Sequence, residues 1–124
     1  MTLNDIMKAL YFKKEAFFVD MFGKIKHNQT TLYGDRNNCV SEKHIERWLY
    51  INDLLNVSAF LNEGWCPDWK DKAQAKFIIC LQEKRIHVSE IEQPLSFTYF
   101  KSKEIAEKAI EIMGVKALEA IFMG

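Results

Sequence analysis

The spacing of the apolar residues changes at Lys76, and this change limits what the chain can fold into. Before it, apolar residues recur at intervals of three and four, as at Ile45, Trp48 and Leu49, which is the period of one helix face. From residue 77 to 82 they alternate instead, which is the period of a half-buried strand. Helices that are segregated along the sequence from an antiparallel sheet indicate an α+β domain.

The first forty or so residues are expected to contain a helix and a long loop. Thr2 or Asn4 can cap the helix, and its apolar face continues at helical spacing as far as Ile25. The segment 27–40 is rich in Asn, Thr and Gly and is expected to be a long loop. Ser41 can then cap a second helix.

The ends of the remaining helices carry their own signals. The second helix is expected to end at Asn62 and Gly64, and its wide apolar stripe indicates cover on more than one side. Ser102 can cap a third helix, which Gly114 stops or kinks before a short final helix. The apolar faces of the second helix and the C-terminal helices are the expected cover for the sheet.

The sheet is expected to be a meander of three short antiparallel strands joined in chain order. The first strand covers residues 77–82, and the pair Glu83 and Lys84 makes the turn into a second strand within residues 85–92. A third extended run, LSFTYF, covers residues 95–100. The architecture predicted here is therefore N-terminal helices, a three-stranded meander, and one or two C-terminal helices packed on it.

The third strand is expected to have one buried face and one solvated face, because side chains alternate along a strand. Leu95, Phe97 and Tyr99 form the apolar set and are expected in the core. Ser96 and Thr98 lie between them and are expected in solvent.

The length and the charge balance limit the class of protein. At 124 residues the chain has the length of one domain, with a helical part over residues 1–64 and a sheet-plus-helix part over residues 65–124. Lys and Arg number 17, and Asp and Glu also number 17. No global field therefore favours nucleic acid or an anionic membrane surface.

The cysteines and the hydropathy pattern bear on the compartment. Cys39, Cys66 and Cys80 are three in number and widely spaced, which argues against a disulfide framework and for a reducing compartment. The N-terminus lacks the basic-then-apolar order of a signal peptide, and no apolar run approaches the ~20 residues that span a bilayer. We expect a cytoplasmic protein with no membrane partner.

The sequence contains no pattern that carries catalytic or metal chemistry. It has no C-x-x-C or H-x-x-x-H pair, no G-x-S-x-G and no glycine-rich phosphate loop. Cys66 would need a base beside it to be a nucleophile, and the sequence places no histidine there. We predict that the protein is not an enzyme and that it has no catalytic residue, no metal ligand and no cofactor.

The stretch EGWCPDWKDKAQAKF, which begins at Glu63, places two tryptophans around a proline between the second helix and the sheet. Pro67 fixes its own φ angle and favours an extended residue before it, so the segment forms a stiff corner. The indoles either seal the edge of the core or anchor a partner, and both roles can hold with Trp65 inside and Trp69 at the rim. The candidate partner-binding residues are Trp65, Asp68, Trp69, Lys70, Lys72 and Lys76.

The same stretch carries a resemblance. The runs LNEGWCPDW, QAKF and FTYFKSKEIAEKAIEIMG resemble a pattern LN-x-G-W-x-P-D-W, Q-x-K-aromatic and F-K-S-x-E-x-A, found in small uncharacterised proteins of bacterial phages and mobile elements. The resemblance covers residues 61–114 and implies an origin rather than a mechanism. One departure is the first strand, which begins Phe77-Ile78-Ile79 where those proteins are richer in tyrosine.

Together these observations favour a non-enzymatic protein-binding domain of phage or mobile-element origin. The resemblance implies, as its most specific form, an anti-CRISPR type of inhibitor whose partner is a host nuclease or ribonucleoprotein. The alternative is a small nucleic-acid-binding protein, because LSFTYFKSK interleaves aromatic and basic residues. A third reading is a structural protein of a phage or element assembly.

Overall fold

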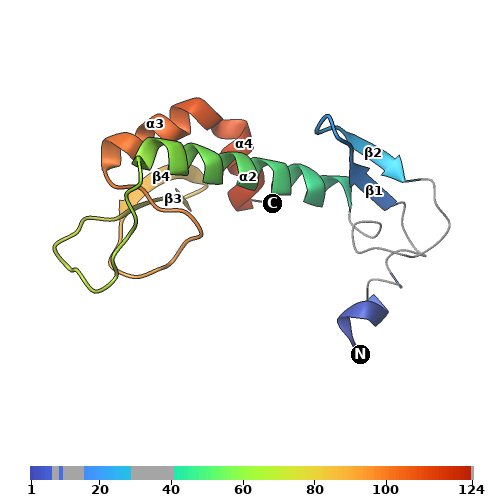
Figure 1. Cartoon of the computed structure of the whole chain (residues 1–124), viewed down its shortest axis with the longest axis horizontal. Coiled ribbons are helices and arrows are strands. Elements are labelled where there is room, and N and C mark those ends of the chain that lie inside the picture. The colour runs from blue at the N-terminus through green and yellow to red at the C-terminus, as the bar shows by residue number, and fades with distance from the viewer. Residues whose placement is uncertain (7–8, 10–15, 29–40, 124) are drawn as a thin grey trace. The chain divides into compact units, whose positions relative to one another are not determined.

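The computed structural model describes residues 1–6, 9, 16–28 and 41–123 (Figure 1). Its contacts divide the chain into two compact units, Met1–Trp48 and Leu49–Gly124, and each unit is described by itself. The division falls within helix α2 (Glu42–Asn62), whereas the two parts that the sequence predicts meet between residues 64 and 65.

The chain begins with a capped helical turn, as the sequence predicts. Residues 3–6 are helical. The Thr2 hydroxyl accepts from the backbone N–H of Asp5 at 3.2 Å, and the Asp5 carboxylate accepts from the backbone N–H of Thr2 at 2.9 Å. This reciprocal pair is a capping box, which satisfies two donors that a helix start leaves free.

The expected continuation of this helix to Ile25 is wrong. Strands β1 (Ala16–Val19) and β2 (Ile25–Asn28) form an antiparallel hairpin in which Val19 pairs with Ile25. The loop expected over residues 27–40 is wrong at its first two residues, because residues 27 and 28 belong to β2. Its remainder, residues 29–40, lies outside the described residues.

The turn of this hairpin explains why helical spacing was misleading. The Asp20 carboxylate accepts from the backbone N–H groups of Phe22 at 2.8 Å and Lys24 at 2.9 Å. Gly23 has a φ of 76°, a left-handed conformation that glycine adopts without steric cost. Met21, counted on the apolar helix face, is 89% exposed in this turn. Local turn chemistry outweighs a three-and-four spacing of apolar residues.

Helix α2 begins and ends where the sequence predicts. The Ser41 hydroxyl accepts from the backbone N–H of His44 at 3.2 Å, which is an N-cap. After Asn62 the backbone turns through two residues with positive φ, Glu63 at 49° and Gly64 at 85°. The carbonyl of Asn62 then accepts from the backbone N–H of Trp65 at 2.9 Å, which closes the helix end.

The second unit contains the predicted hairpin of β3 (Phe77–Gln82) and β4 (Arg85–Glu90). The two turn residues, Glu83 and Lys84, have φ angles of 52° and 66°. Two consecutive positive φ angles make a type I′ turn, whose twist matches that of the paired strands.

Two helices follow, again as predicted. Helix α3 (Lys103–Met113) is capped by Ser102, whose hydroxyl accepts from the backbone N–H of Ile105 at 3.1 Å. Gly114 ends it with a φ of 84°, and α4 (Val115–Met123) follows directly.

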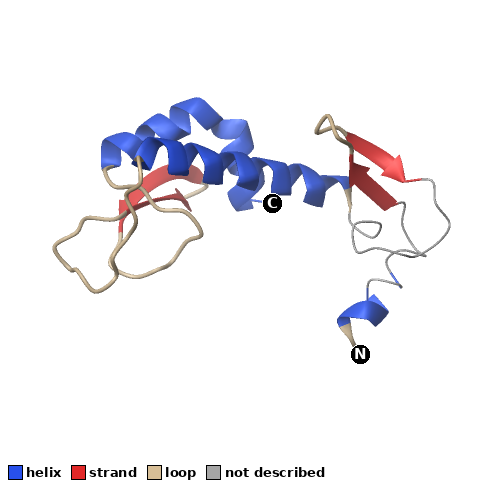
Figure 2. Cartoon of the chain, viewed as in Figure 1, coloured by secondary structure: helices blue, strands red, loops and turns tan. Residues whose placement is uncertain are grey.

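The helices of the second unit cover one face of the hairpin, which confirms an α+β fold (Figure 2). Helices α3 and α4 both contact β3 and β4, and side chains of α2 pack against the same cluster. The buried members of this core are Leu54, Ile79, Phe100, Ala106, Ala109, Leu118 and Ile121.

The predicted three-stranded meander is not present. The third strand is reduced to one antiparallel bridge, in which Phe77 and Phe100 exchange backbone hydrogen bonds of 3.0 and 2.9 Å. This bridge joins the segment to β3, whereas a meander would place it beside β4.

The faces expected for this segment are also wrong. Leu95 is 70% exposed and Phe97 is 42% exposed, whereas Thr98 is 3% exposed and Phe100 is fully buried. The reason is that the chain bends at Ser96 and Phe97 before it becomes extended, so strand alternation does not apply there.

Candidate functional site

The tryptophan corner (residues 65–76) connects α2 to β3 without regular secondary structure. Two aspartates shape it in the same way. The carboxylate of Asp68 accepts from the backbone N–H of Lys70 at 3.0 Å, and that of Asp71 accepts from the N–H of Ala73 at 2.9 Å. These are consecutive Asx turns.

A side-chain amide joins the two ends of the corner. The Gln74 amide oxygen accepts from the backbone N–H of Asp68 at 2.6 Å, and its amide nitrogen donates to the carbonyl of Cys66 at 3.2 Å. The amide therefore pairs with an extended backbone as a neighbouring strand would. Pro67, which has no N–H, lies between these two pairing points.

Lys76 holds the corner from inside. Its side chain is 3% exposed, and its Nζ atom donates to the carbonyls of Asp71 at 2.9 Å and Gln74 at 3.0 Å. The same atom lies 5.4 Å from the ring centroid of Trp69, within the range of a cation–π contact. The charge is thus solvated by protein groups, as a buried ammonium requires.

Trp69 connects the corner to the segment that precedes α3. Its ring meets that of Tyr99 edge to face, with centroids 5.0 Å apart, a favourable aromatic geometry. The Tyr99 hydroxyl in turn bonds the backbone N–H and the carbonyl of Ser96. Trp65 and Trp69 are both half-buried, so the assignment of Trp65 to the inside and Trp69 to the rim stays a prediction.

Asn62 fixes the same segment from the other side. Its amide nitrogen donates to the carbonyl of Tyr99 at 2.8 Å, and its amide oxygen accepts from the backbone N–H of Lys101 at 3.1 Å. This repeats the geometry of Gln74. The segment around Phe100 therefore has a partner along each edge, β3 on one and the Asn62 amide on the other.

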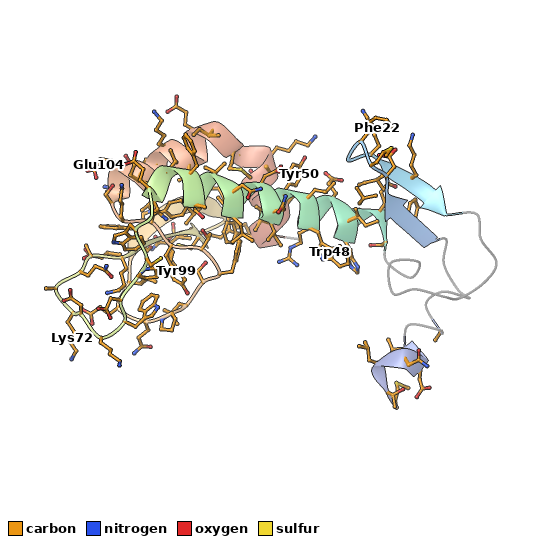
Figure 3. All side chains as sticks on the ribbon, in the orientation of Figure 1. Phe22, Trp48, Tyr50, Lys72, Tyr99 and Glu104 are labelled. Atoms are coloured by element: carbon orange, nitrogen blue, oxygen red, sulfur yellow. The ribbon has the colours of Figure 1, made fainter. Side chains whose placement is uncertain are left out.

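A pocket of about 210 Å³ opens beside Trp69, between the corner and the chain that leaves β4. In Figure 3, Lys72 lies at the outer end of the tryptophan corner, and Tyr99, which belongs to the segment before α3, lies nearer the strands. The pocket lining combines one indole with two lysines, three carboxylates and two amides, and it comprises Trp69, Asp71, Lys72, Gln74, Lys76, Glu90, Ile91, Glu92 and Gln93.

The predicted partner-binding residues fall into two groups. Asp68, Lys70 and Lys72 are exposed, and the two tryptophans are half-buried. Lys76 is buried, and its ammonium is bound to two carbonyls. Of the predicted partner-binding residues, Trp69, Lys72 and Lys76 line the pocket, whereas Trp65, Asp68 and Lys70 do not.

Sequence reasoning missed the residues that hold the site. Asn62 was interpreted only as a helix end, Glu90 only as part of a solvated strand face, and Gln74 had no structural role assigned to it. A lone amide or carboxylate carries no sequence signal for a contact with a distant segment. A partial signal existed for Lys76, since it directly precedes a buried strand and is apt to be covered with it.

Among the described residues, no group of three His, Cys, Asp or Glu side chains could hold a metal ion. Cys66 is exposed, and the Cys80 sulfur lies 3.5 Å from the Ser89 hydroxyl. Cys39 lies outside the described residues. None of the described helices combines the length and the apolar character needed to cross a bilayer.

Comparison with known proteins gives no relative: no protein-family model, no curated protein and no solved structure matches this chain.

Proposed function

We propose that the protein is a non-enzymatic protein-binding domain that contacts its partner through the tryptophan corner and the pocket beside Trp69. The observation that carries this proposal is that the corner has no regular secondary structure and is nevertheless held by side-chain hydrogen bonds. The Gln74 amide bonds the backbone of Cys66 and Asp68, and the Lys76 ammonium bonds two carbonyls from the buried side. A surface that is already ordered loses little conformational entropy when it binds. Such a surface suits recognition of a folded partner.

The charges beside the pocket favour a protein partner over a nucleic acid. Asp71, Glu90 and Glu92 place three carboxylates in its lining, and Lys72 is its exposed cation. A nucleic-acid site needs a positive surface for the phosphates. The alternative of nucleic-acid binding therefore gains no support from this surface.

The origin and the kind of partner belong to the proposal as well. We take the protein to act in the cytoplasm as a phage or mobile-element product that binds a host protein, and inhibition of a CRISPR-type nuclease is its most specific form. This part rests on the motif that runs from Leu61 to Gly114. It is consistent with binding by shape and buried aromatic contacts, which need no catalytic group.

Affinity capture from the native host with the full chain, followed by mass spectrometry, tests the proposal. We expect a stoichiometric protein complex that persists at moderate salt. Retention on nucleic acid that falls steeply between low and moderate salt would favour the alternative instead.

A charge reversal on the pocket rim then localises the contact. Glu92→Arg changes an exposed pocket residue, and Glu111→Arg makes the same change on an exposed position of α3 as a control. The carboxylates of the pocket are complementary to a basic group of the partner, and an arginine at position 92 would repel that group. We therefore expect Glu92→Arg to weaken the captured complex at least about tenfold. Equal affinity for both variants would place the contact elsewhere.

A further inference from the structure

Among residues 1–6, 9, 16–28 and 41–123, none pairs with the backbone along the outer edge of β4. Phe77 of β3 exchanges both of its hydrogen bonds with Phe100, so its N–H and C=O point away from β4. Hydrogen-bonded and non-hydrogen-bonded pairs alternate along an antiparallel ladder. By the register of the hairpin, the backbone groups of Ile86, Val88 and Glu90 therefore point away from β3.

Two further observations support this assignment. The backbone N–H of Ile91 donates to the carbonyl of Lys76 at 2.9 Å, so the next pair along the ladder is hydrogen-bonded, as the alternation requires. Within the part of the chain that the structure describes, no backbone bond outside the hairpin involves Ile86, Val88 or Glu90. None of the three is fully buried, and Glu90 is exposed.

The edge is free because the last extended segment went to the other side of the hairpin. A meander would have placed residues 95–100 beside β4, but Phe100 pairs with β3. Asn62 then binds the outer side of that segment, so β3 is partly covered while β4 is left open. The open edge ends at Glu90, which is also part of the pocket lining.

We propose that a partner protein binds by adding an extended strand to the free edge of β4. The inference deepens the proposed function and rests on it. Unpaired N–H and C=O groups at every second residue are matched by the backbone of another strand, and main-chain hydrogen bonds supply affinity in this mode. The pocket at the end of the edge supplies specificity through a side chain.

The charges indicate which strand fits. Residues opposite Ile86 and Val88 lie next to half-buried apolar side chains, so apolar residues fit there. A basic residue fits opposite Glu90, because the carboxylates of Asp71 and Glu92 line the same pocket and opposite charges across strands attract.

A second copy of this chain fits less well. Antiparallel pairing of two β4 strands about Val88 would set Ile86 of each copy opposite Glu90 of the other. That arrangement places an apolar side chain against a carboxylate twice.

Amide hydrogen exchange measured by NMR on the full chain tests the edge directly. The probe is the tightest binder from an array of synthetic peptides about six residues long, the usual length of a strand. We expect that binder to carry alternating apolar residues and one Lys or Arg. At saturation, exchange should slow at least about tenfold at Ile86, Val88 and Glu90, with smaller changes at Arg85 and His87, which already face β3.

A matched pair of substitutions supplies the second readout. Glu90→Pro removes the outward N–H and the carboxylate, whereas Glu90→Ala removes the carboxylate alone. We expect peptide affinity to fall at least about tenfold for Glu90→Pro and about threefold for Glu90→Ala, since a lost hydrogen bond and a blocked edge add to the lost charge. If Glu90→Pro does not fold, the exchange experiment on the unaltered chain decides.

Three results would overturn the inference: no peptide binder, a binder that protects other amides, or self-association through β4 in place of peptide binding. Each outcome leaves the proposed function separately testable. If the complex captured from the host is unaffected by Glu90→Pro but weakened by Glu92→Arg, the strand-addition inference fails and the proposed function stands.

Discussion

Asn62→Ala, which removes the side-chain amide, should lower the free energy of unfolding by several times as much as the same substitution at an exposed asparagine. Asn62 is 7% exposed, and its two hydrogen bonds, 2.8 Å to the Tyr99 carbonyl and 3.1 Å to the Lys101 N–H, reach backbone groups with no other partner in the described part of the chain. Asn62→Ala leaves both groups unpaired within a largely closed site.

The size of the effect follows from these two groups. An unpaired polar group in a protein interior costs about 1–3 kcal/mol, so two cost about 2–6 kcal/mol. Tyr99 and Lys101 are only half-buried, and water can reach them in part, which favours the lower half of that range. Alanine regains about 0.5 kcal/mol through its helix propensity. We therefore expect a net loss of about 2.5 kcal/mol from the free energy of unfolding.

Equilibrium unfolding in urea, followed by tryptophan fluorescence, measures this loss. With an m-value of about 2 kcal/mol per molar, the midpoint should fall by about 1.2 M. Asn56→Ala is the matched control, because Asn56 is an exposed asparagine of the same helix. That control should stay within about 0.5 kcal/mol of the unaltered protein.

A second readout separates this explanation from a general loss of stability. Asn62→Ala should speed amide exchange at Phe100 more than at β3 residues farther along the hairpin, because the segment loses one of its two edge partners. If Asn62→Ala lowers the free energy of unfolding by less than about 1 kcal/mol, and so by no more than Asn56→Ala does, Asn62 does not hold the segment.

Three further predictions concern other parts of the chain. Lys76→Met should lower the free energy of unfolding by about 2 kcal/mol, because the loss of two charge-assisted hydrogen bonds outweighs the removed cost of burying an ammonium. The control Lys72→Met, at an exposed position, should change the free energy of unfolding by less than about 0.5 kcal/mol. Equal urea midpoints for the two variants would refute the role given to Lys76. Thr98 has a buried hydroxyl with no hydrogen-bond partner among the described residues, so Thr98→Val should raise the thermal midpoint by the equivalent of about 1 kcal/mol, whereas a lower midpoint would show that the hydroxyl is bonded. The hydrogen bond from the Lys24 N–H, and then that from the Phe22 N–H, holds the pKa of Asp20 below its usual 3.8. The ionised carboxylate therefore stabilises the turn at neutral pH, and this contribution is lost as the pH falls through the lowered pKa. NMR shifts of β1 and β2 should report the loss, and Asp20→Asn, which keeps an acceptor oxygen, should abolish this pH dependence.

The parts of the fold that could be predicted are those whose causes are local. Ser41 and Ser102 begin their helices because a hydroxyl accepts from a backbone N–H three residues later in the chain. The Glu83-Lys84 turn follows from the alternating runs on either side of it. The hairpin over residues 16–28 was missed even though its cause is local, because the apolar spacing of that stretch also fits a helix and the Asp20 turn was not recognised.

The candidate site was predicted in position but not in construction. The proline and the tryptophans drew attention to residues 65–76, where the structure shows an Asx turn at Asp68. The sequence gives only a partial signal for which lysine faces outward: Lys72 and Lys76 occur in the same polar stretch, and only the position of Lys76 directly before a buried strand favours its burial. Burial of Lys76 depends on carbonyls that converge on it only when the corner is folded.

By itself, the sequence determined the class of fold, the hairpin of β3 and β4, and the bounds of the three long helical segments, because caps, turns and apolar periods act over a few residues. The tertiary structure alone decided which edge of the hairpin the last extended segment joins. Phe100 pairs with Phe77 of β3, and Asn62 binds the outer side of the same segment through residues 37 and 39 positions away. Contacts at that separation leave no periodic trace in the sequence.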